Sequence, residues 1–270
     1  MKTDNSFNPI ILNSVLHGQS ASTNKPVIVL IHGLFGSMDN LSALRRHFEQ
    51  DYQVISVDLP DHGQSPHLSQ FSFEIYADAV IHTVQERTQN KIILIGHSLG
   101  GKVAMRIAQK MSSQVKALIV LDIAPVKYAS RHQQVFSALN NVELTSITSR
   151  KDAQQALAQY LDEPATQSFL LKGLYQQSDS SWAWRYNVTG LHRDYALLSD
   201  WPYEDASYSG ATLFVKGTES DYITKAHQST IQSLFPRATA KLVQAGHWLH
   251  AEKPQVVNAV ITNFLRVNIN

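Results

Sequence analysis

A serine flanked by glycines, between a strand and a helix, is the feature that most limits how this chain can fold. Residues 92–95 are four β-favouring apolar residues, and they run directly into Gly-His-Ser-Leu-Gly at residues 96–100. The following apolar residues recur every four positions, which is typical of one buried helix face (Leu99, Val103, Ile107 and Met111). The pattern therefore predicts a strand, a tight turn and a helix, with Ser98 at the apex of the turn.

Ser98 stands where such a turn exposes a nucleophile. Glycine on either side permits a strained backbone and allows the helix to approach the strand closely. The turn lifts the hydroxyl above the carboxyl end of a parallel sheet, where a substrate can reach it. The alternative is a glycine-rich turn with an idle serine. The partners that a nucleophilic serine requires are also present, and they argue against that alternative.

The same residues overlap with a phosphate-binding pattern. Residues 96–102 read Gly-x-x-x-x-Gly-Lys, which is the start of a nucleotide-binding loop. Such a loop continues with Ser or Thr, whose hydroxyl binds Mg²⁺, whereas this chain has Val103. We therefore reject nucleotide binding and expect Lys102 to be a solvated residue in the first turns of the helix.

Apolar runs alternate with helical patterns along most of the chain. The expected strands are residues 26–31, 52–58, 92–95, 115–121, 211–216 and 240–244. Continuous apolar runs separated by helices favour an α/β fold, with a mostly parallel sheet covered by helices on both faces. The alternation stops near Pro125, after which the chain is polar and helix-rich. We expect an α/β core of residues 1–125 and 206–270, with a helical cap insertion at residues 126–205.

Composition excludes several other classes of protein. The 23 basic and 22 acidic residues are well mixed, so the charge favours no nucleic-acid partner. No segment approaches the roughly 20 apolar residues of a membrane span, and residues 1–19 show no secretory signal. The absence of cysteine excludes disulfides and thiol catalysis and suits a cytoplasmic location. No metal-ligand pattern is present, so we expect no metal. We also expect a small-molecule substrate and no cofactor.

A nucleophilic serine requires a base, and twelve histidines compete for that role. His247 follows the last expected strand and is preceded by Gly246, which allows the loop to turn, whereas His250 lacks such a neighbour. We therefore expect His247 to be the base. The oxyanion of the tetrahedral intermediate requires two N–H donors. We expect them from the backbone of Leu99, directly after the nucleophile, and of Leu34, in the turn after the first apolar strand.

Four motifs resemble those of the α/β-hydrolases, in the family's order. They are His-Gly-Leu-Phe-Gly at 32–36, Asp-Leu-Pro-Asp-His-Gly-Gln-Ser at 58–65, Gly-His-Ser-Leu-Gly-Gly at 96–101 and Gly-His-Trp at 246–248. The chain is similar in particular to the bacterial YbfF-type esterases, through Gly-Ser-Met-Asp-Asn at 36–40, Leu-Asp-Ile-Ala-Pro-Val at 121–126, Trp-Arg-Tyr-Asn at 184–187 and His-Trp-Leu-His-Ala-Glu-Lys-Pro at 247–254. The resemblance implies a Ser–His–Asp esterase or thioesterase that acts on short-to-medium acyl esters and acyl-CoA thioesters.

The carboxylate that orients His247 has two candidates. Many α/β-hydrolases place this carboxylate after the family's seventh strand, which corresponds to residues 211–216 here. In the loop that follows, this chain has Ser220 at the usual position and Asp221 one residue later. The YbfF-type resemblance instead implies an acid after the family's sixth strand, which corresponds to residues 115–121 here. The acid at that position is Asp122. Both choices keep the order serine, aspartate, histidine. We prefer Asp122 and keep Asp221 as the alternative.

The sequence thus predicts a serine esterase or thioesterase that works through an acyl-enzyme. A carbon–carbon bond hydrolase or a cofactor-free perhydrolase would use the same triad. A non-catalytic ligand-binding protein could also use the same fold, because a fold does not determine a function.

Overall fold

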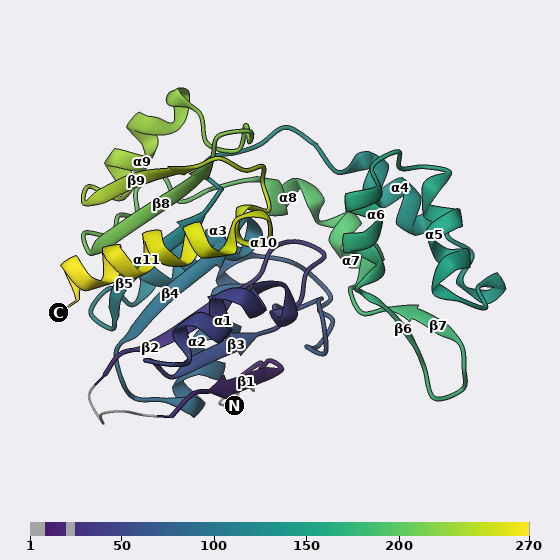
Figure 1. The fold of residues 1–270 in the computed structure, drawn as a ribbon, viewed down its shortest axis with the longest axis horizontal. Coiled ribbons are helices and arrows are strands. Elements are labelled where there is room, and N and C mark those ends of the chain that lie inside the picture. Colours follow the sequence, from purple (N-terminus) through teal and green to yellow (C-terminus); the bar gives the residue numbers. More distant parts are fainter. Residues whose placement is uncertain (1–8, 20–24, 270) are drawn as a thin grey trace, which may run out of the picture.

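The computed structural model describes residues 9–19 and 25–269. Within these residues the central element is a seven-stranded sheet with the strand order β1-β3-β2-β4-β5-β8-β9 (Figure 1). Every neighbouring pair is parallel except β1 and β3. The strands are β1 (Ser14–His17), β2 (Val27–Ile31), β3 (Val54–Val57), β4 (Ile92–His97), β5 (Val115–Leu121), β8 (Ala211–Gly217) and β9 (Ala238–Val243).

Helices cover both faces of the sheet. The helices of this part are α1 (Ser42–Phe48), α2 (Phe73–Arg87), α3 (Leu99–Lys110), α9 (Gln228–Leu234), α10 (Leu249–Glu252) and α11 (Pro254–Asn268), with short 3₁₀ helices η1 (Met38–Leu41) and η3 (Lys225–His227). Side chains of α1 and α11 share one hydrophobic core with the sheet, and those of α2 and α3 share the other. Ile28 of β2 faces the first core and Val29 the second, because successive side chains of a strand point to opposite faces. This arrangement explains the continuous apolar runs and confirms the expected fold class.

The antiparallel edge strand β1 is missing from the sequence prediction. It is only four residues long, and Val15 and Leu16 are exposed. An edge strand that is not covered on both faces needs no continuous apolar run, so it leaves little signal in the sequence.

Between β5 and β8 the chain leaves the sheet. It forms α4 (Gln133–Asn141), η2 (Leu144–Ser146), α5 (Arg150–Ala158), α6 (Pro164–Leu171), the strands β6 (Leu174–Gln176) and β7 (Trp182–Trp184), α7 (Val188–Arg193) and α8 (Tyr195–Ser199). Most of this segment lies to one side of the sheet (Figure 1). The segment is mainly helical, as expected, but it also contains the short hairpin of β6 and β7, which the sequence did not indicate.

Candidate active site

Ser98 occupies a strained turn between β4 and α3. Its φ and ψ angles are 52° and −119°, a region that L-residues rarely adopt. The backbone N–H of Ser98 donates to the carbonyl of Leu121 at 3.1 Å, and its own carbonyl accepts from Gly101 and Lys102 at 2.8 and 3.1 Å. These bonds hold the turn between two neighbouring strands and the start of the helix. The side chain of Ser98 stays partly exposed.

Gly96 and Gly100 are required by the close approach of strand and helix. A Cβ on Gly96 would lie 2.2 Å from the carbonyl oxygen of Gly100. A Cβ on Gly100 would lie 2.3 Å from the carbonyl oxygens of Ile31 and His32. Both distances are far shorter than any van der Waals contact, so only glycine allows this turn.

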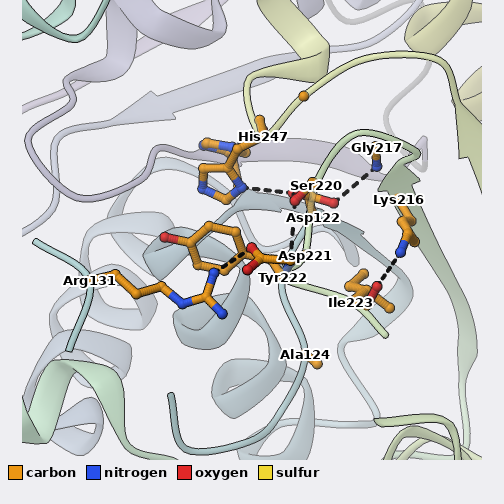
Figure 2. Close-up of polar contacts among 12 residues, drawn as sticks. Asp122, Ala124, Arg131, Lys216, Gly217, Ser220, Asp221, Tyr222, Ile223 and His247 are labelled. Carbon is orange, nitrogen blue, oxygen red and sulfur yellow. Dashed lines mark hydrogen bonds and ion pairs between the residues drawn. The ribbon is translucent and has the colours of Figure 1, made fainter. Parts of the chain in front are cut away.

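Asp122 and His247 meet beside this turn. The His247 Nδ1 lies 2.8 Å from the Asp122 Oδ2, as Figure 2 shows. Asp122 is fully buried, and its carboxylate also accepts hydrogen bonds from the backbone N–H of Gly217, at 3.0 Å, and from the Ser220 hydroxyl. A carboxylate can only accept, so His247 donates to it from Nδ1, which leaves Nε2 as the nitrogen that faces away from Asp122.

Asp221 lies elsewhere. Its carboxylate pairs with the Arg131 guanidinium, and its side chain is 74% exposed. The hydrogen bond from Arg131 holds the pKa of Asp221 below its usual range. Of the two carboxylates that the sequence offered, the structure brings Asp122 to His247 and directs Asp221 to Arg131 (Figure 2).

Sequence reasoning missed Tyr222, which packs on His247, and Tyr128, which packs on Tyr222. The Tyr222 ring stacks on the His247 imidazole, with centroids 3.9 Å apart and planes at 18°. Tyr128 accepts from the backbone N–H of Ala124 at 2.8 Å and donates to the carbonyl of Tyr222 at 2.5 Å. Tyr222 follows the alternative acid directly in the sequence, and only the fold shows that its ring faces the histidine.

Two cavities meet at Ser98. The first has a volume of about 40 Å³, and we call it the Lys102 chamber; its lining includes Leu34, Ser98, Leu99, Lys102, Tyr128 and Leu198. The second has a volume of about 70 Å³, and we call it the His250 chamber; its lining includes Leu34, Ser98, Phe169, His247, Trp248 and His250. Among the described residues the backbone N–H groups of Leu34 and Leu99 donate to no acceptor. Both groups therefore remain available beside the serine.

Other histidines around the two chambers are neutral. Burial, together with the nearby His247, lowers the pKa of His132 to about 4 and that of His250 to about 3. Burial also holds the pKa of His97 well below its usual range, and its Nε2 lies 2.9 Å from the carbonyl oxygen of His247. At neutral pH these three imidazoles add no positive charge next to Ser98.

The polar loop at residues 58–65 is held by hydrogen bonds. The Asp58 carboxylate accepts from the backbone N–H of Met38 at 2.8 Å, and His62 Nε2 accepts from the backbone N–H of Phe35 at 3.1 Å. In the described ranges no group of three or more His, Cys, Asp or Glu side chains is arranged to hold a metal ion. The loop fixes the turn that carries Leu34.

The expectation that Lys102 is solvated is wrong. Its side chain is only 2% exposed, and its Nζ lies within 3.0 Å of three backbone carbonyl oxygens. Those carbonyls belong to residues distant in the sequence, so a local pattern could not reveal them.

Residues 26–254 match the family model of the alpha/beta hydrolase fold. The chain belongs to the α/β-hydrolase family. This α/β-hydrolase is 35% identical to esterase YbfF of Escherichia coli (strain K12), over 92% of this chain and 95% of that protein. It is 34% identical to the sn-1-specific diacylglycerol lipase ABHD11 of Mus musculus, over 89% of this chain and 81% of that protein.

A solved structure supports the same relationship. A marine microorganism esterase superposes with a TM-score of 0.90 at 30% identity, over 95% of this chain and 100% of the other. The resemblances to the family and to its YbfF-type esterases are thus both confirmed. In the part of the chain that the structure describes, no helix has both the length and the apolar character needed to cross a bilayer.

Proposed function

We propose that this α/β-hydrolase cleaves short-to-medium acyl esters and acyl thioesters through an acyl-enzyme. Ser98 is the nucleophile, His247 is the base and then the acid, and Asp122 orients His247. The backbone N–H groups of Leu34 and Leu99 form the oxyanion hole. The relatives confirm the enzyme class in its coarser form, a carboxylic ester hydrolase, since they are named as an esterase and a lipase.

One observation carries the proposal. The hydrogen bond between His247 and the buried Asp122 stands at the edge of a cavity that Ser98 also lines. With the proton held on Nδ1, the Nε2 of His247 can take the proton of the serine hydroxyl. A serine hydroxyl is a weak nucleophile without such a base, so this pair provides what Ser98 needs.

The reaction begins when Ser98 Oγ attacks the carbonyl carbon of the substrate and His247 Nε2 takes the hydroxyl proton. Negative charge develops on the carbonyl oxygen beside the two free N–H groups of Leu34 and Leu99, which stabilise it. His247 then returns the proton to the departing alkoxide or thiolate, and the acyl-enzyme forms. Water attacks next, His247 acts as base a second time, and the acid product leaves.

Residues 126–205 form a cap in this proposal, and residues 1–125 and 206–270 form the catalytic core. Phe169 of α6 lines the His250 chamber, and Leu198 of α8 lines the Lys102 chamber. Side chains from this segment therefore close the space above Ser98. Small chambers favour single soluble substrate molecules over a lipid surface, which supports the proposed preference for short-to-medium acyl groups.

A diacylglycerol is a second candidate substrate, because one relative at 34% identity is named as a lipase specific for it. A carbon–carbon hydrolase, a perhydrolase and a non-catalytic binding protein remain alternatives, since the first two would use the same triad.

The test compares kcat/KM for p-nitrophenyl esters from acetate to palmitate, acyl-CoA thioesters, dispersed diacylglycerol and a triglyceride emulsion. Ser98→Ala is the matched control for background hydrolysis. We expect turnover of short-to-medium esters and thioesters, with little activity on the emulsion. A preference for the emulsion would contradict the enclosed pocket. A folded protein that hydrolyses none of them would favour the carbon–carbon hydrolase or the binding protein.

A further inference from the structure

Lys102 is a buried cation that the proposed reaction does not use. It lies one helical turn after Ser98 on α3, and its side chain is 2% exposed. The Nζ donates to the carbonyls of Val126 and Ser199, each at 3.0 Å, and of Asp200 at 2.8 Å. An ammonium group has three N–H donors, and here each has an acceptor.

The three carbonyls belong to the two connections between the sheet and the 126–205 segment. Val126 lies where the chain leaves the sheet after β5, and Ser199 and Asp200 lie where it returns after α8. The connections also bond to each other, because the backbone N–H of Tyr128 donates to the Ser199 carbonyl at 2.9 Å. A single side chain of α3 thus holds the outgoing and the returning chain together.

The surroundings of Lys102 compensate its charge only in part. The Nζ lies 4.9 Å from the centre of the Tyr128 ring and 5.9 Å from that of Phe73. Burial lowers the pKa of Lys102 to about 7, and the Asp200 carboxylate opposes this shift. A buried charge is often no more stabilising than an apolar side chain of similar size. Lys102 therefore adds little to the stability of the fold beyond what an apolar side chain would, and its specific role is to fix the position of the chain segments that it binds.

These segments form one wall of the Lys102 chamber. Tyr128, Leu198 and Ser199 line this chamber together with Lys102 and Ser98. A movement of either connection would therefore change the depth of the space next to the nucleophile.

The Lys102 chamber is the side on which the acyl chain must lie. The leaving group has to receive its proton from His247, and His247 lines the His250 chamber but not the Lys102 chamber. The leaving group therefore occupies the His250 chamber. The other substituent of the carbonyl carbon, the acyl chain, then points into the Lys102 chamber, whose lining includes the apolar Leu34, Leu99 and Leu198.

We propose that Lys102 is a positioning residue that fixes both connections of the 126–205 segment, and that the wall held in this way limits the length of the acyl chain. This inference rests on the proposed ester hydrolysis and deepens it, because it assigns the acyl side of the site and the side chain that controls its depth. Lys102 acts through the backbone of Val126, Ser199 and Asp200 and takes no part in the chemical step.

The experiment compares Lys102→Met with Lys110→Met. The first removes the ammonium and keeps an apolar stem, and the second makes the same change on α3 at a residue that pairs with Glu74 and Asp78. Steady-state kinetics with p-nitrophenyl acetate, butyrate, hexanoate and octanoate give the acyl-length profile. Amide hydrogen exchange reports how firmly residues 124–131 and 196–202 are held.

In Lys102→Met the loosened wall should admit longer acyl chains. We therefore expect the ratio of kcat/KM for butyrate to kcat/KM for octanoate to fall about tenfold, which is the effect that one methylene has in a fitted pocket. The change should lie mainly in KM for octanoate and less in kcat, because Lys102 touches no reacting atom. Amide exchange should be faster in both connections. Lys110→Met should keep the wild-type ratio and exchange. Lys102→Gln, which retains two donors, should shift the same quantities in the same direction by less, and it serves if the Met variant folds poorly.

Two outcomes would overturn the inference while the proposed function stands. One is an unchanged ratio and unchanged exchange in both Lys102 variants. The other is an equal loss of kcat on every ester without faster exchange in the connections, which would place the effect of Lys102 in the chemical step. If the wild-type protein hydrolyses none of the esters, the proposed function fails and the limit on acyl length fails with it.

Discussion

Replacement of Asp122 by asparagine tests how His247 is oriented. Three donors converge on the Asp122 carboxylate: the Gly217 N–H on Oδ1, and the Ser220 hydroxyl and His247 Nδ1 on Oδ2. An asparagine amide has one acceptor oxygen and one NH₂ group. Whichever way it turns, its NH₂ meets at least one of these donors.

The expected size of the effect follows from this conflict. If the NH₂ faces His247, the imidazole must accept on Nδ1 and place its proton on Nε2, which then cannot take the serine proton. In a serine protease such a change lowers kcat by about 10⁴, and we expect a loss of that order here. The buried mismatch should also lower the free energy of unfolding by about 1–3 kcal/mol.

Asp221→Asn is the matched control. Its carboxylate is largely exposed and pairs only with Arg131, so the change should alter stability by less than about 1 kcal/mol and activity by about threefold or less. The assay is kcat/KM for p-nitrophenyl butyrate, with thermal unfolding of each variant to confirm the fold. An Asp221→Asn enzyme that loses activity while Asp122→Asn keeps it would refute the assignment of the acid.

Three further predictions concern the ring on His247, the turn and the buried imidazoles. Tyr222→Leu should lower kcat about three- to tenfold through loss of the ring stacked on His247, whereas Tyr222→Phe should keep it; equal rates for both would contradict this role. Gly100→Ala should destabilise the fold by more than about 3 kcal/mol in urea unfolding, since its Cβ would overlap two carbonyl oxygens. His62 and His250 both have a pKa of about 3 in the fold, so between pH 6.5 and 3 the unfolded chain binds more protons. Stability should therefore fall by about 1.4 kcal/mol per pH unit for each histidine as the pH drops below 6.5, and a flat unfolding midpoint from pH 7 to 5 would contradict their burial as neutral groups.

The turn at Ser98 could be predicted from sequence because its causes are local. The strand, the two glycines and the apolar face of the helix are all within residues 92–111, and the structure reproduces that arrangement in β4 and α3. The parallel strands were also predictable, since burial on both faces demands continuous apolar runs. The exposed edge strand β1 needs no continuous apolar run, so the sequence did not predict it.

The parts that the sequence did not reveal depend on contacts between distant residues. Lys102 looked like a solvated helix residue, yet its acceptors lie 24, 97 and 98 residues away. The choice between Asp122 and Asp221 depended on where two loops meet. The resemblance favoured Asp122, and in the structure its Oδ2 lies 2.8 Å from the His247 Nδ1. Tyr222 is a functional candidate only because the fold places its ring on that histidine.

The identity of the nucleophile is the central claim, and covalent labelling tests it most directly. A fluorophosphonate reacts with an activated serine, because such a serine attacks the phosphorus and expels fluoride. After digestion, mass spectrometry should find the adduct on Ser98, and Ser98→Ala should remain unlabelled while retaining the wild-type melting temperature. An adduct on another residue, or no adduct on the folded wild-type protein, would contradict the assignment of Ser98 and the mechanism built on it.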